Sequence, residues 1–415
     1  MAPSKKEIYA TAKKIWNAEK VQSWEDAGVD IVIGKREGYC FWDLDGRRII
    51  NMHLNGGVYN LGHRNPEVQE ALVKATELYD AGNHYFPSVV KNELAQSLLD
   101  ISPDTMEYVT FNNSGGESID AAIKFAKHVT RRPRVISVEG AYHGATGIAM
   151  EAGGEMIIDF FGMKTDPDEY TRVEYNNLEA LEEALKHNDT ACVIIESIPA
   201  TYGFPIPDEG YLKGVEELAH RYGALYIADE VQTGLMRSGS MWCSVGYGAT
   251  PDMIVTGKGL SGGFYPMSAV IMNPISSTWL KIGGSAHLSS FGSSELGCAV
   301  ACKALEITQR ESTAENVRIL TNFFSEELAR LQKKHSGFFK GTRQRGLIIG
   351  LETTHPEGSV ELMKALYKNG VWAIRAAFDH SVLQFKPGLL MDKALAEEVI
   401  QIMDVSMGEA ANRID

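Results

Sequence analysis

The chain has 415 residues, of which 44% are hydrophobic, and its 54 Asp and Glu outnumber 40 Lys and Arg, giving a formal charge of −14. A chain of this length can bury a large core and is expected to form two or three units. The acidic balance argues against a broad nucleic-acid surface but not against a local anion site. Five cysteines without a CxxC pair argue against a disulfide framework or a thiolate zinc site, so we expect no metal and a cytoplasmic protein.

The N-terminal residues alternate charged and apolar side chains at helical spacing without a long apolar run. This pattern indicates a surface helix rather than a signal peptide or a membrane span, so no membrane partner is expected. Residues 39–52 then predict two short strands around the Asp45-Gly46 turn, and residues 66–80 predict an amphipathic helix. We assign residues 1–65 to a segment that joins a small domain.

Short apolar runs alternate with helical stretches through the middle of the chain, at 108–111, 134–138, 191–195, 224–228 and 253–255. Such alternation is typical of an α/β fold with a mostly parallel sheet between helices, whose ligands bind at the carboxyl ends of the strands. We predict a large domain over residues 66–300. Long helical patterns followed by short strands predict a smaller α+β domain over residues 301–415.

The first candidate site is Ser114-Gly115-Gly116, between a predicted strand and a predicted helix. Glycines allow the backbone to approach an anion, and the first turn of a helix offers unpaired N–H groups and a positive dipole end. A phosphate could bind there. Turns of this kind are also common for packing reasons, so this motif alone does not decide the function.

Two further residues follow predicted strands. Asp229 ends an apolar run and needs a cationic or protonated partner if it is buried, although a structural ion pair would also satisfy it. Lys258 lies between Gly257 and Gly259, where burial would lower its pKa and make its amine a nucleophile toward an aldehyde. Alone, it could equally extend into solvent.

The combination is informative, because pyridoxal 5′-phosphate (PLP) needs all three features. It requires a phosphate site, an acid that keeps the ring nitrogen protonated and an amine for its aldehyde. The sequence therefore predicts a PLP enzyme acting on a small primary amine or amino acid, with Lys258 as its Schiff-base lysine.

From about Gly38 to Asp392 the sequence resembles the class III (omega-type) aminotransferases of PLP fold type I. The matching motifs are LGHRNP at 61–66, SGGES at 114–118, AYHG at 141–144, IIES at 194–197, DEVQTG at 229–234 and GKGL at 257–260. The resemblance implies a homodimer with shared active sites that moves an amino group from a small amine or amino acid to a keto acid such as pyruvate.

The resemblance also implies roles for individual residues. Ser114, Gly115 and Gly116 would hold the phosphate, Tyr142 and Val231 would cover the two ring faces, Asp229 would pair with the ring nitrogen and Gln232 would bind the ring hydroxyl. Glu196 would help to position Asp229 or a neighbouring basic group, and Lys258 would also move the substrate's α-proton. Ser290 replaces a threonine that reaches the phosphate of the neighbouring subunit.

The substrate side departs from the family pattern. Gln384 stands where members that use α-ketoglutarate have an arginine, and the following Pro-Pro-Leu is altered to Lys386-Pro387-Gly388-Leu389. Arg375 resembles a mobile arginine that binds substrate carboxylates, although it could equally be a surface arginine. Tyr59 and Phe86 could line the substrate pocket, but aromatic residues are more often part of the core.

Other outcomes of PLP chemistry stay open. The same fold family contains racemases and lyases that act on phosphoethanolamine or on an amino-phosphonate, and a lyase would release ammonia or phosphate without a keto acid. A noncatalytic PLP-fold protein is disfavoured because Lys258 and Asp229 are both present. An NAD enzyme is disfavoured because no strand-linked GxGxxG appears near the N-terminus.

Overall fold

The computed structural model describes residues 3–414, apart from the side chain of Glu155. Its largest element is a seven-stranded sheet of order β4-β10-β9-β8-β7-β5-β6, in which only β10 runs antiparallel to its neighbours. The strands are β4 (Tyr108–Asn112), β5 (Arg134–Val138), β6 (Tyr170–Val173), β7 (Thr190–Glu196), β8 (Leu225–Asp229), β9 (Met253–Thr256) and β10 (Ser268–Met272). The predicted α/β fold with a mostly parallel sheet is confirmed.

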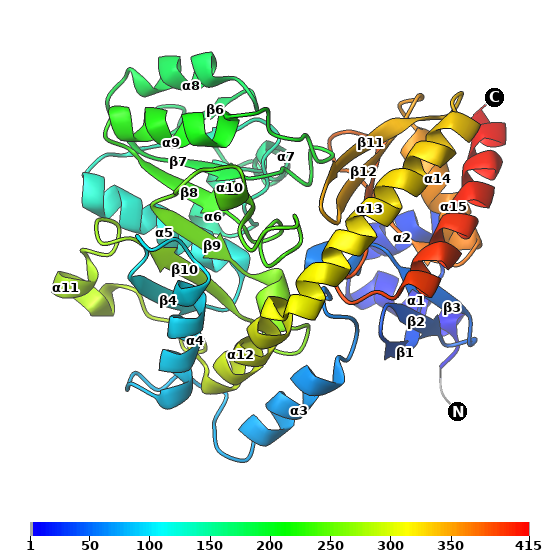
Figure 1. Cartoon of the computed structure of the whole chain (residues 1–415), viewed down its shortest axis with the longest axis horizontal. Coiled ribbons are helices and arrows are strands. Elements are labelled where there is room, and N and C mark those ends of the chain that lie inside the picture. Colours follow the sequence, from blue (N-terminus) through cyan, green and yellow to red (C-terminus); the bar gives the residue numbers. More distant parts are fainter. Residues whose placement is uncertain (1–2, 415) are drawn as a thin grey trace.

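Helices cover both faces of this sheet (Figure 1). On β7, Cys192 and Ile194 join the apolar cluster under helix α5, whereas Val193 and Ile195 join the cluster under α8 and α9. Because both faces are buried, the central strands are continuous apolar runs rather than alternating ones. The helices of this domain are α3 (Pro66–Ala75), α4 (Val89–Asp100), α5 (Gly115–Thr130), α6 (Gly147–Ala152), α7 (Glu155–Phe160), α8 (Leu178–Leu185), α9 (Tyr211–Arg221), α10 (Cys243–Gly246), α11 (Leu280–Gly283) and α12 (Glu295–Gln309).

The rest of the chain forms a second lobe around two four-stranded sheets (Figure 1). Their orders are β1-β2-β3-β13 and β11-β12-β15-β14, with strands β1 (Ile33–Glu37), β2 (Cys40–Asp43), β3 (Arg48–Asn51), β11 (Phe339–Arg345), β12 (Ile348–Thr353), β13 (Val371–Trp372), β14 (Ile374–Arg375) and β15 (Val382–Phe385). The parallel pairing of β3 with β13 sets Ile50 opposite Val371 and joins the two ends of the chain. One core cluster contains Met52 and Leu54 together with Leu383 and Phe385.

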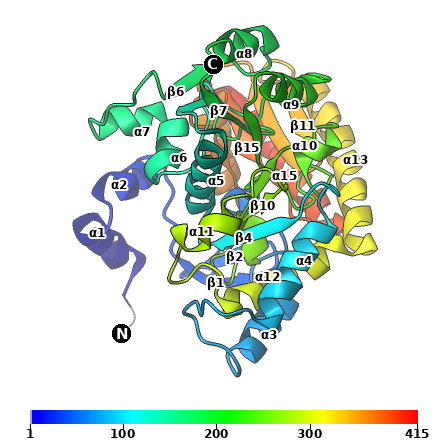
Figure 2. The ribbon, with the colours of Figure 1, turned by 90° about the vertical axis from the view of Figure 1, so that its left-hand side faces the viewer.

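In the part of the chain that the structure describes, five α-helices complete this lobe, and Figure 2 shows α1 and α2 at one side of the molecule and α13 at the other. They are α1 (Lys5–Ile15), α2 (Ala18–Asp26), α13 (Glu311–Lys334), α14 (Gly358–Lys368) and α15 (Lys393–Ile414). Within residues 3–414, no helix is both long enough and apolar enough to cross a membrane.

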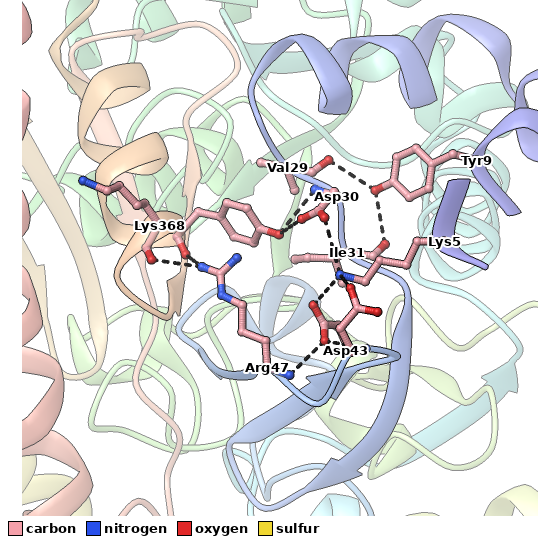
Figure 3. A network of polar contacts seen from close by, with 10 residues as sticks. Lys5, Tyr9, Val29, Asp30, Ile31, Asp43, Arg47 and Lys368 are labelled. Carbon is pink, nitrogen blue, oxygen red and sulfur yellow. Dashed lines mark hydrogen bonds and ion pairs between the residues drawn. The ribbon is translucent and has the colours of Figure 1, made fainter. Parts of the chain in front are cut away.

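Polar contacts hold α1 against the second lobe (Figure 3). The Lys5 ammonium lies 2.6 Å from Asp43, whose side chain is almost fully buried, and 3.4 Å from Asp30. Burial alone would raise the pKa of the Asp43 carboxyl, but hydrogen bonds from Lys5 and from backbone N–H groups lower it below its usual value. The Tyr9 hydroxyl contacts the carbonyl groups of Val29 and Ile31.

We predict that Lys5→Met releases α1, because Asp43 would lose its cation while it remains buried. The loss of ~1–3 kcal/mol corresponds to roughly 5- to 150-fold faster amide exchange over residues 5–15. Because the pKa of Asp43 is lowered in the folded state, this protection is present at neutral pH and is lost in acid, below about pH 4. Hydrogen exchange checks both statements. The exposed neighbour Lys6 provides the control Lys6→Met, and equal exchange in both variants would contradict the prediction.

Candidate active site

The carboxyl ends of five strands bring the candidate residues to one edge of the large sheet. Strand β4 leads to Ser114, β5 to Tyr142 and His143, β7 ends at Glu196, β8 ends at Asp229, and β9 leads to Lys258. The strand register sets Glu196 opposite Asp229, and Asp229 opposite Val255. The structure thus gathers residues that are up to 144 positions apart (258 − 114) at the edge where parallel α/β sheets bind ligands.

Ser114 to Gly116, here called the phosphate cup, form the start of helix α5. The Ser114 hydroxyl caps the helix by accepting a hydrogen bond from the N–H of Glu117 at 3.3 Å. The Ser268 hydroxyl donates to the Ser114 carbonyl at 2.7 Å and so fixes the turn. A Cβ atom on Gly115 would lie 2.8 Å from Cγ1 of Val231, so only glycine fits there without a shift. The first turn of a 16-residue helix is thereby held open for an anion.

Asp229 is a buried carboxylate, 4% exposed, with two partners. Its Oδ1 accepts a hydrogen bond from the N–H of Val231 at 3.0 Å, and its Oδ2 accepts one from Nδ1 of His143 at 2.7 Å. The Nε2 atom of His143 is buried without a hydrogen-bond partner in the described part of the chain. Our sequence prediction omitted His143. The only signal for it was its place in the AYHG motif, since nothing in the sequence shows that it faces Asp229.

Glu196 lies next to this pair. Burial, together with the negative charge of Asp229, raises the pKa of Glu196 to about 7. Its Oε1 accepts the N–H of Tyr142 at 2.9 Å, and its Oε2 accepts that of Ala200 at 3.4 Å. Glu196 therefore fixes the backbone at Tyr142, whose side chain remains 40% exposed at the edge of the site.

Lys258 is partly buried in a strained backbone conformation, with φ of +42°. Burial lowers the pKa of its amine, and the charges of Asp229 and Glu196 oppose this effect. Within residues 3–414 its amine has no hydrogen bond or ion pair. An amine with a lowered pKa and no partner is suited to react with an aldehyde.

Gly56 closes the site from the second lobe and was also missing from our sequence prediction. A Cβ atom on Gly56 would lie 2.9 Å from Oε1 of Gln232 and 3.2 Å from Cε of Lys258. Its φ of +68° is a conformation that side chains rarely adopt. Gly56 thus brings Gln232 and Lys258 together, and the LNGG sequence at 54–57 is the signal that could have indicated it.

Within residues 3–414, the remaining candidates have no hydrogen bond to the phosphate cup or to Lys258. Ser290 is exposed and its carbonyl accepts a hydrogen bond from the N–H of Asn83, Phe86 is 77% exposed, and the Tyr59 ring packs on His63. Arg375 donates only to the carbonyl of Ala376 in the described residues. The part of the chain that the structure describes, residues 3–414, contains no group of three or more His, Cys, Asp or Glu side chains that could hold a metal ion.

Comparison with known proteins identifies the family. Residues 21–406 match the family model described as aminotransferase class-III. This chain belongs to the class-III aminotransferases. An uncharacterized aminotransferase of Archaeoglobus fulgidus is 40% identical over 99% of this chain and 96% of its own, and an acetylornithine aminotransferase of Methanosarcina acetivorans is 33% identical over 90% and 91%.

A solved structure supports the same assignment. The ornithine aminotransferase of Toxoplasma gondii, whose active site is described as partly occupied by PLP, is 26% identical and superposes with a TM-score of 0.85 over the whole of both chains. Class-III aminotransferases use PLP. The site fits this cofactor, because it combines an open helix start for the phosphate, a buried carboxylate for the ring nitrogen and an amine without a partner.

We predict that Gly56→Ala weakens PLP binding by about 10-fold or more, because the new methyl group would displace Lys258 or Gln232. Gly28→Ala is the matched control, since Gly28 has a similar φ of +72° and no atom within 4 Å of its added Cβ. Both variants should lose ~1–2 kcal/mol of stability from backbone strain. Titration of the apoenzyme with PLP measures the affinity, and equal affinities in the two variants would refute the role of Gly56.

Proposed function

We propose that this class-III aminotransferase moves an amino group from a small primary amine or amino acid to a keto acid such as pyruvate, with Lys258 as the catalytic residue. The observation that carries this proposal is the amine of Lys258, which has a lowered pKa and no partner beside two buried carboxylates. When bound, PLP supplies an aldehyde that takes up the amino group and a ring that withdraws electrons from the α-carbon of the substrate.

The residues of the large sheet would hold the cofactor. The N–H groups of Gly115 and Gly116 and the Ser114 hydroxyl would bind its phosphate. Asp229 would pair with the ring nitrogen, because a carboxylate that already accepts two hydrogen bonds still has lone pairs available. The charge-assisted bond from His143 would keep Asp229 oriented for this contact.

The residues around the ring would complete the cofactor site. Val231 packs against Gly115 and would cover one ring face, and Tyr142 would cover the other. Gln232 would bind the ring hydroxyl. Glu196 would act as a positioning residue, through the N–H of Tyr142 and its charge beside Asp229.

Lys258 would then move the proton. Once the substrate's amino group replaces it at the cofactor, its Nζ atom is free to remove the proton from the substrate's α-carbon. For amino transfer Lys258 would hold this proton and release it at a position other than the substrate's α-carbon. The lowered pKa of Lys258 is consistent with a neutral amine acting as the base.

Transfer is favoured over elimination or racemisation, which begin with removal of the same proton. The curated relatives are named as aminotransferases and transaminases, including acetylornithine and ornithine aminotransferases. Donors with a terminal amine are therefore the first to test. Members of the family that use α-ketoglutarate have an arginine at the position of Gln384. We therefore do not assign their specificity for glutamate to this chain.

A second copy of the chain would complete the site. Segments 83–86 and 288–291 lie side by side, since Asn83 contacts the carbonyl groups of Ser289 and Ser290. They expose large apolar side chains, namely Tyr85, Phe86, Leu288 and Phe291. Such a patch is typical of an interface, and a homodimer would place Ser290 against the partner's cofactor phosphate.

The five free cysteines support a cytoplasmic location.

The proposal is tested by following the absorbance of the purified holoenzyme after amines are added alone, with ammonia and keto products assayed in parallel. We expect conversion to the aminated cofactor, reversed by pyruvate. Lys258→Ala should abolish turnover, and near-normal turnover in that variant would refute the assignment. Sustained release of ammonia without a keto acid would identify a lyase instead.

Asp229→Asn should lower the rate of the amine half-reaction by about 100-fold or more, because an amide does not stabilise a protonated ring nitrogen. Folding should be retained, since the two side chains have the same shape. Rapid-mixing absorbance measures the rate at saturating amine. A loss of less than 3-fold would mean that another group protonates the ring.

A further inference from the structure

Lys386 is a fully buried lysine that the proposed mechanism does not use. It follows strand β15, on which Leu383 and Phe385 point into the core of the second lobe. Gln384 and Lys386 alternate with them and face the large domain, where Gln384 donates a hydrogen bond to the carbonyl of Ala200 at 2.9 Å. The Lys386 ammonium lies 5.2 Å from the ring centre of Phe204.

The ammonium of Lys386 has no acidic partner. Its Nζ donates to Oε1 of Gln384 at 2.5 Å, and within residues 3–414 no carboxylate lies within ion-pair distance of it. Burial, together with the positive charges of Lys258 and Arg237, lowers the pKa of Lys386 well below its usual value. A buried amine without a counter-ion costs free energy in its charged form, and a bound anion would offset that cost.

Lys386 belongs to the surroundings of the catalytic lysine. Its backbone N–H donates to the carbonyl of Met52 at 2.7 Å, next to His53. Hydrogen bonds link Lys386 through Gln384 to the carbonyl of Ala200, whose N–H contacts Glu196. Burial, together with the charges of Lys386 and Lys258, lowers the pKa of His53. The Nδ1 atom of His53 is buried without a partner in the described residues. Lys386 and His53 therefore offer hydrogen-bond donors to a ligand, and in the described residues neither forms an ion pair with a carboxylate.

The residue whose ring contacts the Lys386 amine has a strained backbone. Phe204, on which the ammonium rests, has a φ of +58° and a fully buried ring. A bulky residue in the left-handed region costs about 1–3 kcal/mol and usually marks a functional site. An aromatic ring next to an ammonium group stabilises its positive charge. The Phe204 ring would therefore favour the charged form of Lys386 once an anion binds on another side of the amine.

We propose that Lys386 binds the carboxylate of the amino acid or keto acid substrate, with His53 as a second donor. The inference rests on the proposed function and assigns its substrate class, an amine donor or acceptor that carries a carboxylate. This proposal differs from the assignment of carboxylate binding to Arg375. The strand register sets Arg375 opposite Leu383, and Leu383 lies on the other face of β15 from Gln384 and Lys386.

Binding of a carboxylate should take up a proton. The titratable groups facing Lys386 are Lys258, Arg237 and His53. Burial and the charges of Lys258 and Arg237 favour its neutral form when no ligand is bound, and His53, whose pKa is lowered, adds no negative charge. A carboxylate beside Nζ favours the charged form and so raises the pKa of Lys386. Above the pKa of the empty site, up to one proton should therefore accompany each carboxylate bound.

The probe is propanoate, which has a carboxylate but no amine and therefore cannot react. Calorimetry of the holoenzyme at pH 8, in two buffers of different ionisation enthalpy, measures both its affinity and its proton uptake. For wild type we expect uptake of up to one proton. For Lys386→Met we expect at least about 30-fold weaker binding and no uptake, because one partner of a buried charge pair is removed. Lys393→Met, at an exposed lysine of the same lobe, should behave as wild type.

Three outcomes would overturn the proposal. The first is unchanged propanoate affinity in Lys386→Met, and the second is loss of affinity in Arg375→Met instead. The third is propanoate binding to wild type without proton uptake, which needs no variant and decides the matter even if Lys386→Met does not fold.

The same variants separate this proposal from the proposed function. In single turnovers, Lys386→Met should react at least about 30-fold more slowly than wild type with alanine, but equally fast with ethylamine, which has no carboxylate. Equal losses for both amines would overturn the role of Lys386 in carboxylate binding. If no amine reacts with wild type, the proposed function fails, whereas the propanoate experiment still tests the carboxylate site.

Discussion

The buried carboxylate of Asp229 is the constraint on which the architecture of this site depends. A carboxylate at the end of a central strand, with helices on both faces of the sheet, loses nearly all of its hydration and must be compensated by the protein. His143 and the N–H of Val231 supply that compensation, and both are delivered by loops at the same sheet edge. The order of the strands is what allows one loop from β5 and one from β8 to meet there.

The strands and the main chemistry could be predicted from the sequence because both follow from local patterns. Apolar runs that end in Asp229 or lead to Lys258 are visible in the sequence, and so is the strand-glycine-helix turn at Ser114. Parallel topology then places their ends together. The α/β fold, the family and the cofactor are accordingly confirmed.

Contacts between distant segments could not be predicted in this way. The pairing of His143 with Asp229 spans 86 positions, and a lone histidine gives no sign of its partner. The approach of Gly56 to Lys258 depends on how the second lobe closes on the large domain. The burial of Lys386 depends on the same closure, so its sequence context showed only a departure from the family pattern. The roles of Ser290, Tyr59, Phe86 and Arg375 stay predictions.

Charge in the site is divided between its two sides. Asp229 and Glu196 lie on the large-sheet side, whereas Lys386 and His53 come from the second lobe, with Lys258 between them. Burial raises the pKa of Glu196 and lowers the pKa values of Lys258, Lys386 and His53, so the empty site disfavours charge on both sides. Anions that arrive with the cofactor and the substrate would favour the charged forms of these bases.

Arg237 differs from these bases, because it stays charged in spite of its burial. It is fully buried, and burial lowers its pKa to about 10, which still leaves it charged at neutral pH. Its guanidinium donates to the carbonyl groups of Leu347 and Pro387 and to the side chain of Asn60. These three hydrogen bonds to neutral oxygens fix Pro387 beside Lys386 without placing a negative charge there. The loop is thereby held in place before a carboxylate arrives, so binding requires little further ordering of the residues next to Lys386.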